Sequence, residues 1–305
     1  MTAPAPTTSR FTSEGTNTGH FDAGDWGLLL LTSLIWGSSF LWIAIGLDNF
    51  HPGVIAAGRM VFGASVLWAY PSARKRLPRE AWGAIAVVAV AGNTAPAVFF
   101  PLAQQRIESS VAGMLNSIGP ILTLLLSIAM LRKAPPRGQV VGLMIGMVGA
   151  VLLALPNLSG ADAEPLGVLL ALMAITGYSI SNNFLPPLAQ AHGGPTVIAW
   201  AMLASAVILL PWGVWGLDES NFDWGSLGAV AVLGVVGTGL ARTIFAILNG
   251  RIGAPRSSLV GYLVPVVAVV LGVVVRDESV GAVELGGTAL ILVGAWLISR
   301  AQKPA

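Results

Sequence analysis

The sequence predicts an all-α polytopic membrane protein with ten transmembrane helices, arranged as two inverted-topology repeats of five helices each. First, 55% of the 305 residues are hydrophobic and only 10% are charged, whereas soluble chains carry about 25% charged residues. Second, the apolar residues form long runs, and about 20 such residues cross a bilayer as a helix. Third, the second half of the chain repeats features of the first half at a fixed distance. The absence of cysteine excludes disulfides, thiolate metal sites and cysteine nucleophiles.

Short connections that carry proline, glycine or charge separate the apolar runs, so no loop has room for a soluble domain. Residues 1–25 are rich in Thr, Ser, Pro and Gly and contain no apolar run, which predicts a disordered cytoplasmic tail and not a signal peptide. Residues 301–305 form a second cytoplasmic tail. The expected spans are 26–47, 53–70, 81–103, 107–131, 137–155, 165–188, 194–216, 224–247, 254–275 and 281–299.

The distribution of lysine and arginine predicts the orientation of the chain. If the N-terminus is cytoplasmic, most of these residues fall in cytoplasmic loops, and the opposite side holds only Arg106 and Arg276. Positive residues concentrate on the cytoplasmic side of membrane proteins. We therefore expect an inner-membrane protein with both termini in the cytoplasm, which requires an even number of spans.

An internal repeat divides the chain into two modules, residues 26–156 and residues 157–300. When the chain is aligned with itself at a shift of 145 residues, arginine, proline and glycine positions coincide, and no gap is needed from the third through the fifth span. Because each module has five spans, the second enters the membrane from the opposite side, as in many secondary transporters. The clearest matches are Arg106 with Arg251, Pro120 with Pro265, and Gly142 with Gly287.

Several short motifs resemble those of a known family. Residues 36–40 read Trp-Gly-Ser-Ser-Phe and are followed by Pro52 and Arg59, and each module ends on a Gly-Ala-x-Leu run, at 149–152 and 294–297. The chain resembles a two-module EamA-type member of the drug/metabolite transporter superfamily, and within it the bacterial exporters of aromatic and other amino acids. The resemblance implies a secondary transporter without a cofactor. It would export small neutral or zwitterionic metabolites, or facilitate their passage, by alternating access.

Paired helix interruptions in the two modules predict the substrate site. Proline removes a backbone donor and frees the carbonyl four residues earlier, so Pro120 and Pro265 break the fourth and ninth spans. Glycine-rich breaks occur in the third and eighth spans. We expect a cavity between these four helices, although glycine and proline are also common in packed membrane helices. The substrate-binding candidates are Trp36, Ser39, Asn93, Thr94, Asn116, Tyr178, Asn182, Thr238 and Tyr262, and the gating or kink candidates are Arg59, Pro96, Pro120, Gly237 and Pro265.

Few charged residues lie within the expected spans. Arg59 could snorkel outward, hold an outer gate or meet a substrate carboxylate, and Arg242 is expected to snorkel at the cytoplasmic end of its helix. No Asp or Glu lies deep in a span, although proton-coupled pumps usually carry such groups. The sequence therefore favours a net-neutral solute moving down its own gradient, with a proton-coupled multidrug efflux transporter as the alternative.

Other function classes find less support in the sequence. The three histidines, His20, His51 and His192, are scattered, so no catalytic or metal-binding constellation is expected, and neither a membrane-embedded enzyme nor a lipid scramblase is favoured. No Walker-type loop is present, which excludes ATP-driven transport by this chain alone. The expected partners are a small-molecule substrate and the lipid bilayer, not nucleic acid. A homodimer is possible, but a monomer suffices for a pathway.

Overall fold

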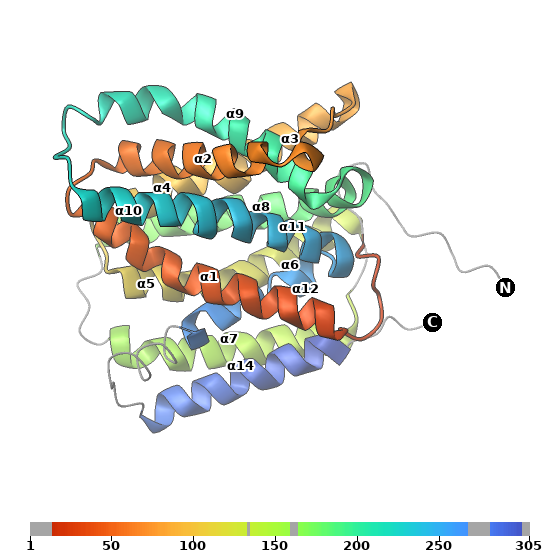
Figure 1. Ribbon diagram of the computed structural model, residues 1–305. Helices are drawn as coiled ribbons and strands as arrows, with labels where there is room; N and C mark the ends of the chain where they lie inside the picture. Colours follow the sequence, from red (N-terminus) through yellow and green to blue (C-terminus); the bar gives the residue numbers. More distant parts are fainter. Residues whose placement is uncertain (1–13, 133–134, 159–163, 268–280, 301–305) are drawn as a thin grey trace.

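The computed structural model describes residues 14–132, 135–158, 164–267 and 281–300, and within these ranges the secondary structure is entirely helical. The helices lie side by side as one bundle, in which the first helix begins and the last helix ends at the same end (Figure 1). Seven helical stretches are long and apolar enough to cross a membrane, and two shorter apolar helices cover Arg137–Leu153 and Leu285–Arg300. The chain is therefore a multi-pass membrane protein.

Most residues of the expected spans in the described ranges are helical, and the exceptions include Tyr70, residues 107–108, Gly216 and residues 258–259. The tail 301–305, residues 1–13 and the end of the span at 254–275 lie outside the described ranges. The elements are α1 Ala23–Leu47, α2 Pro52–Ala69, η1 Pro71–Arg74, η2 Arg79–Ala81, α3 Trp82–Ala89, η3 Val90–Thr94, α4 Ala95–Gln104, α5 Ser109–Leu115, η4 Asn116–Ile118, α6 Gly119–Leu131, α7 Arg137–Leu158, α8 Pro165–His192, α9 Gly194–Trp215, α10 Trp224–Val232, η5 Leu233–Leu240, α11 Ala241–Ile252, α12 Ala254–Ser257, a helical stretch at 260–267, and α14 Ala282–Arg300.

Local sequence signals set the helix ends. Asp22 caps α1 in a capping box with Asp25, and Asp223 accepts a hydrogen bond from the Ser226 backbone N–H to cap α10. Such caps satisfy backbone donors that have no partner within the helix. Gly193 and Gly253 end α8 and α11 with φ angles of 82° and 81°, where a residue with a side chain would be strained.

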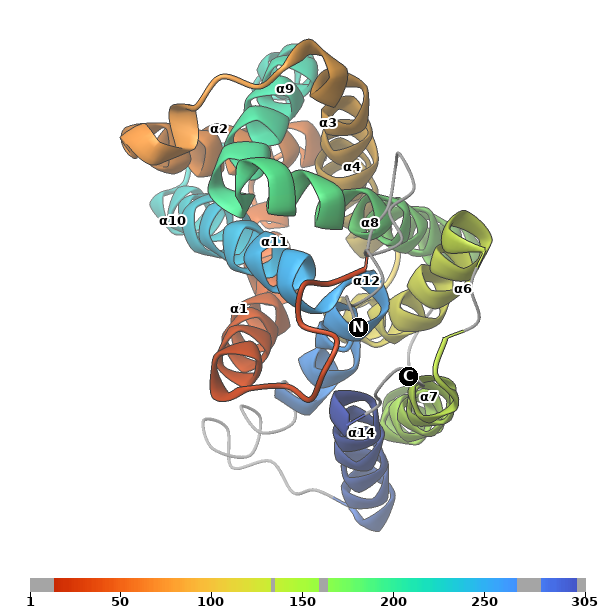
Figure 2. The ribbon, with the colours of Figure 1, turned by 90° about the vertical axis from the view of Figure 1, so that its right-hand side faces the viewer.

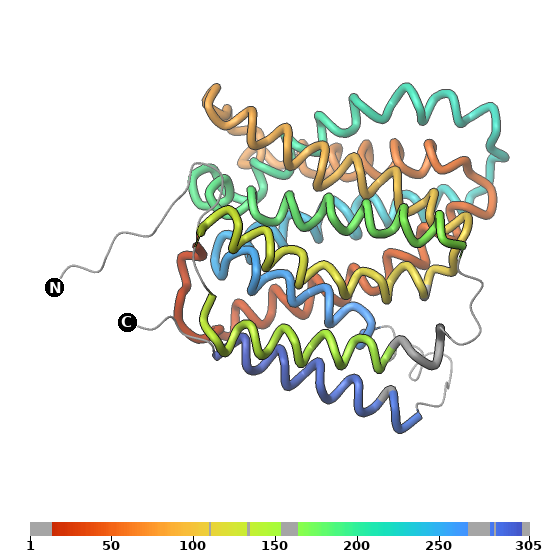
Figure 3. Tube along the Cα trace, turned by 180° about the vertical axis from the view of Figure 1, so that it is seen from behind, coloured from red at the N-terminus to blue at the C-terminus, as the bar shows by residue number. Residues whose placement is uncertain are grey.

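Three spans are interrupted where the sequence places glycine, asparagine or proline. The third and eighth spans contain the π-helical segments η3 and η5, and the fourth contains the 3-10 turn η4 directly before Pro120. π-helical turns leave backbone groups displaced from the regular ladder and are frequent at functional sites. Seen from behind, α8 runs through the middle of the bundle between the α3–α4 and α5–α6 segments, which places it beside two of these breaks (Figure 3).

The helices α7 and α14, which end the two halves of the chain predicted as modules, pack against each other. Helices α7 and α14 lie together at one edge of the bundle (Figure 2). A Cβ added at Gly294 would lie 2.5 Å from the Gly142 carbonyl oxygen, and one added at Gly287 would lie 2.7 Å from the Gly149 carbonyl oxygen. The absence of side chains at these four positions is therefore what allows the two backbones to touch, as at many membrane helix crossings.

Residues 14–22 differ from the expected disordered tail. These residues are called the strap below. The Thr16 backbone N–H donates to the Gly250 carbonyl, and the Asn17 backbone N–H donates to the Arg251 carbonyl, both at the end of α11. Arg251 in turn bonds Asp22 and Asp25, each at 2.7 Å. The composition of the segment is typical of disorder, but its polar backbone fits the unpaired carbonyls at a helix end, which composition alone does not reveal.

Candidate functional site

A cavity lies inside the bundle between α1, α2, α4, η4, α6, α8, α11 and residues 258–261. The volume open to the centre of a water molecule is about 60 Å³. It is named the central cavity below. Its lining is Trp36, Ser39, Phe40, Ile43, Arg59, Phe100, Asn116, Gly119, Pro120, Ile175, Tyr178, Ser179, Asn182, Phe245, Ser258, Val260 and Gly261.

Aromatic rings form the walls of the central cavity. The ring centroids of Trp36 and Tyr178 lie 6.2 Å apart at an angle of 21°, and Trp36 also contacts Phe245 at 5.1 Å. Phe40 meets Phe100 edge to face at 5.2 Å. The Trp36 indole N–H donates to the Gly237 carbonyl of η5 at 3.0 Å, so the π-helical segment fixes the orientation of this wall. Offset and edge-on ring contacts of this kind suit a flat apolar or aromatic solute.

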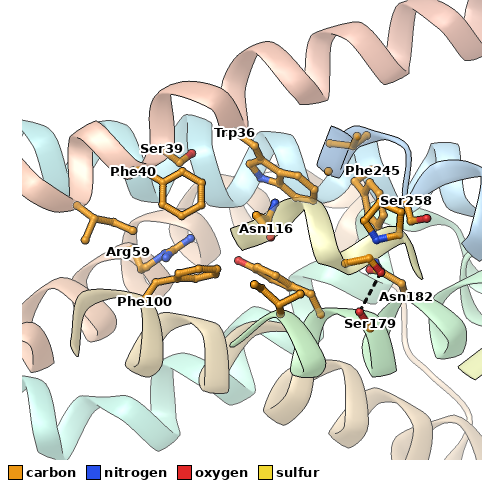
Figure 4. Close-up of a pocket in the computed structure, with 17 residues that line it drawn as sticks. Trp36, Ser39, Phe40, Arg59, Phe100, Asn116, Ser179, Asn182, Phe245 and Ser258 are labelled. Carbon is orange, nitrogen blue, oxygen red and sulfur yellow. Dashed lines mark hydrogen bonds between the residues drawn. The ribbon is translucent and has the colours of Figure 1, made fainter. Parts of the chain in front are cut away.

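Arg59 occupies one side of the cavity. Its side chain is 5% exposed, and its Nε donates to the Thr238 hydroxyl at 3.0 Å, which in turn donates to the Leu233 carbonyl. The guanidinium points toward the centre of the cavity (Figure 4). Within the described residues no carboxylate lies at ion-pair distance from it. The alternative in which Arg59 snorkels outward is therefore wrong. The cavity carries a fixed positive charge, which the alternative contact with a substrate carboxylate requires.

Arg242 is also buried and does not snorkel. It is 2% exposed, its Nε donates to Asn93 Oδ1 at 3.2 Å, and its Nη2 donates to the Ser181 hydroxyl at 3.3 Å. Its Cζ lies 5.5 Å from the centre of the Tyr178 ring. The prediction failed because α11 continues to Ile252, five residues beyond the expected end of the span. Arg242 is thus about 15 Å from the end of its helix, too deep for its side chain to reach water.

Polar groups occupy the side of the cavity opposite Arg59. Ser179, Asn182 and Ser258 lie there, with Asn116 nearer the centre (Figure 4). The Ser179 hydroxyl donates to the Gly119 carbonyl at 3.3 Å, whereas Asn182 Oδ1 is buried without a hydrogen-bond partner. Buried acceptors normally have a donor. This side of the cavity can therefore accept hydrogen bonds from a ligand.

The structure brings together about half of the residues predicted from sequence. The central cavity is lined by Trp36, Ser39, Arg59, Asn116, Pro120, Tyr178 and Asn182. A second, smaller space is lined by Trp36, Arg59, Met60, Gly92, Asn93, Tyr178, Gly237, Thr238 and Arg242. Thr94, Pro96 and Pro265 line neither space.

Tyr262 is placed on the opposite side of its helix. Its hydroxyl donates to the Leu143 carbonyl at 2.9 Å, and its ring fills the space beside Gly146, so it packs against α7 and not against a solute. Depth in the membrane follows from sequence position, but the direction of a side chain around the helix axis does not.

The sequence did not predict four residues that line these spaces, namely Phe40, Phe100, Phe245 and Arg242. Only Phe40 carried a signal, because it lies four residues after Trp36 and shares its helix face.

The described residues contain no group of three or more His, Asp or Glu side chains that could hold a metal ion. A buried cavity with aromatic walls, enclosed by apolar helices that cross a bilayer, is the architecture of a membrane protein that handles small solutes. The chain belongs to the EamA-like transporter family, which matches residues 26–155 and 165–300. The family places it in the drug/metabolite transporter superfamily, as the sequence motifs predict.

Relatives with assigned names are transporters. The chain is 24% identical over 275 residues to an uncharacterized transporter of Archaeoglobus fulgidus, covering 90% of this chain and 98% of that one. It is 26% identical over 277 residues to a probable terminal-alkyne amino-acid exporter of Streptantibioticus cattleyicolor, covering 89% and 92%. It is 23% identical over 284 residues to a probable amino-acid metabolite efflux pump of Salmonella typhimurium, covering 88% and 93%. A solved crystal structure matches with a TM-score of 0.71 at 19% identity over 91% of this chain and 96% of the other, which shows the shared fold.

Proposed function

We propose that this protein is a secondary transporter that exports small carboxylate-bearing metabolites, or facilitates their passage, with amino acids and their aromatic members as the main substrates. The observation that carries the proposal is the buried guanidinium of Arg59, which faces the central cavity without a carboxylate partner among the described residues. Relatives named as amino-acid or metabolite exporters support the substrate class.

The chemistry of the cavity matches the parts of an amino acid. A guanidinium can hold a carboxylate by two parallel hydrogen bonds. The carbonyl and amide oxygens at Asn116 and Asn182 are acceptors suited to an ammonium group, and the rings of Trp36 and Tyr178 give a flat apolar wall for a side chain. This assignment replaces the expected neutral cavity with one that has a positive side and an accepting side.

Alternating access requires two modules that can exchange conformations, and several contacts support an inverted repeat. Shifting η3 by 145 residues places it on 235–239, within η5, so both modules carry a π-helical segment at equivalent positions. A Cβ added at Gly261 would lie 3.1 Å from Pro120 and 3.2 Å from the Asn116 carbonyl oxygen. Because Asn116 and Gly261 are equivalent positions, the two breaks would meet at the axis that relates the modules.

The proposed orientation places both termini in the cytoplasm of the inner membrane. Two exposed positions test it in this cysteine-free chain, Ser72 and Asp218. An impermeant maleimide added to intact cells should label Asp218→Cys and leave Ser72→Cys unlabelled until the cells are broken open. The reverse pattern would overturn the orientation.

Transport by purified protein in liposomes tests the function. Counterflow of labelled phenylalanine is expected for the wild type and should fall at least tenfold for Arg59→Gln, because a bidentate carboxylate contact is lost. Arg106→Gln is the matched control, since Arg106 pairs with Glu164 at 3.6 Å outside the cavity and should retain flux. Equal flux through both variants would remove Arg59 from the site. An organic cation tested in the same vesicles addresses the multidrug alternative.

A further inference from the structure

Beside the central cavity lies the smaller space in which the two buried arginines meet, named here the arginine chamber. Arg59, Asn93, Thr238 and Arg242 supply its polar lining, and Trp36 and Tyr178 line both this chamber and the central cavity. The side chains close over the chamber and leave no room for the centre of a water molecule. Since Tyr178 forms a wall common to both spaces, a rotation of its side chain would join them.

The arginine chamber has a charge imbalance. Arg59 and Arg242 are 5% and 2% exposed and interact with each other as like charges. In the described part of the chain neither has a carboxylate at ion-pair distance, and both line the chamber beside the Tyr178 ring. An unpaired charge away from water is strongly disfavoured. The missing negative charge is therefore expected from a ligand.

Donors in the chamber remain unused. Arg242 uses Nε and Nη2 on Asn93 and Ser181, whereas its Nη1 is buried without a partner. Asn93 Nδ2 is likewise buried without a partner, because Asn93 bonds Arg242 through its oxygen. These two donors without an acceptor, beside two guanidinium groups, form an electrostatic environment for an anion and not for a cation.

The local backbone is built to hold these side chains close together. Gly92 lies in η3, and a Cβ there would clash with the Ser181 hydroxyl and with Arg242 Nη2. Thr238 in η5 bonds its hydroxyl to a carbonyl five residues earlier, a π-helical spacing, and this positions it to accept from Arg59. The two irregular segments thus place both guanidinium groups around one point.

We propose that the arginine chamber, once a rotation of Tyr178 has opened it to the central cavity, is an anion site. In it Arg242 acts together with Arg59 on one small anionic group, either a free halide or a second acidic group of the substrate. A zwitterionic amino acid has no net charge, so its binding would leave the total charge of the two arginines unchanged. Its transport would therefore need a halide. A substrate with two acidic groups would supply the second anion itself. The proposal rests on the proposed function only for its transport consequences, because halide binding is measurable without a substrate.

Halide binding is tested on the purified protein in gluconate buffer at constant ionic strength. Chloride or bromide should raise the melting temperature in a saturable way, as any ligand of the folded state does, and should change the fluorescence of Trp36. Arg242→Gln should abolish both responses, whereas Arg242→Lys, which keeps the charge, should retain them at higher halide concentration. Arg106→Gln is the control with a charge removed elsewhere. Equal responses of wild type and Arg242→Gln would overturn the anion site.

Transport in liposomes separates the two sources of the anion. With phenylalanine, replacing chloride by gluconate should lower wild-type flux at least fivefold. Flux of 4-carboxyphenylalanine, whose second carboxylate can occupy the chamber, should be unaffected. In Arg242→Gln the flux of both solutes should no longer depend on chloride. Halide binding without transport of either solute would refute the proposed function and leave the anion site intact. The anion site would be refuted if phenylalanine flux did not depend on chloride and was the same in wild type and Arg242→Gln. The proposed function would then remain intact.

Discussion

The adjacent glycines Gly286 and Gly287 of α14 provide a sensitive test of how the two modules are joined. A Cβ at position 286 would meet nothing within 4 Å, whereas one at position 287 would lie 2.7 Å from the Gly149 carbonyl oxygen and 2.8 Å from the Leu153 backbone nitrogen. Ordinary contact begins at 3.4 Å, so Gly287→Ala must push α14 and α7 apart by about 0.7 Å. Gly286→Ala requires no movement.

The expected magnitudes follow from these distances. Overpacking against backbone costs about 1–3 kcal/mol, and replacing a helical glycine by alanine contributes up to about 1 kcal/mol of stability. Because the propensity gain is the same for both variants, the difference between them reports the packing. Gly287→Ala should be less stable than Gly286→Ala by about 1–3 kcal/mol.

The assay is an SDS titration of the purified variants in lipid micelles, followed by circular dichroism, which yields the free energy of unfolding. The wild type should fall between the two variants or close to Gly286→Ala. If Gly287→Ala were as stable as Gly286→Ala, the close approach of α7 and α14 would be wrong, and the glycine contacts would lose their value as support for a repeat.

Three further predictions concern the strap and the packing of Tyr262. Arg251→Gln removes the main partner of the fully buried Asp25 carboxylate and should lower the free energy of unfolding by about 2 kcal/mol, less than for a fully buried pair because the arginine side chain is partly exposed. Tyr262→Phe loses the hydrogen bond to Leu143 and should cost about 1 kcal/mol without changing substrate affinity. The Asp25 backbone N–H, and then Arg251, hold the pKa of Asp22 below its ordinary value of 3.8, so Asp22 contributes stability above pH 3.8 that is lost as the pH falls through its folded-state pKa.

Each of these predictions has a direct check. Limited proteolysis should cut the strap faster in Arg251→Gln than in the wild type, and unchanged cleavage would contradict the strap contacts. If Tyr262→Phe changed the affinity for phenylalanine, Tyr262 would belong to the substrate site after all. Unfolding measured between pH 3 and pH 6 should lose part of its acid dependence in Asp22→Asn, and identical profiles would contradict the lowered pKa.

Sequence reasoning predicted the helical segments well and the lining of the site only in part. Hydropathy is set by residues close together in the chain, so the expected ranges matched helices over most of the described residues. The breaks at Asn93, Asn116 and Thr238 were likewise visible, because proline and glycine act on the backbone next to them.

The sequence by itself therefore determined the class of the protein, its helical segments and the residues at which the helices break. Only the tertiary structure decided what those residues contact. Tyr262 turned toward α7, Arg242 joined Arg59 at one chamber, and residues 14–22 became a strap across the end of α11. Depth and hydropathy are properties of a position along one helix. The side-chain partner depends on the rotation of that helix against its neighbours, which packing over the whole bundle fixes.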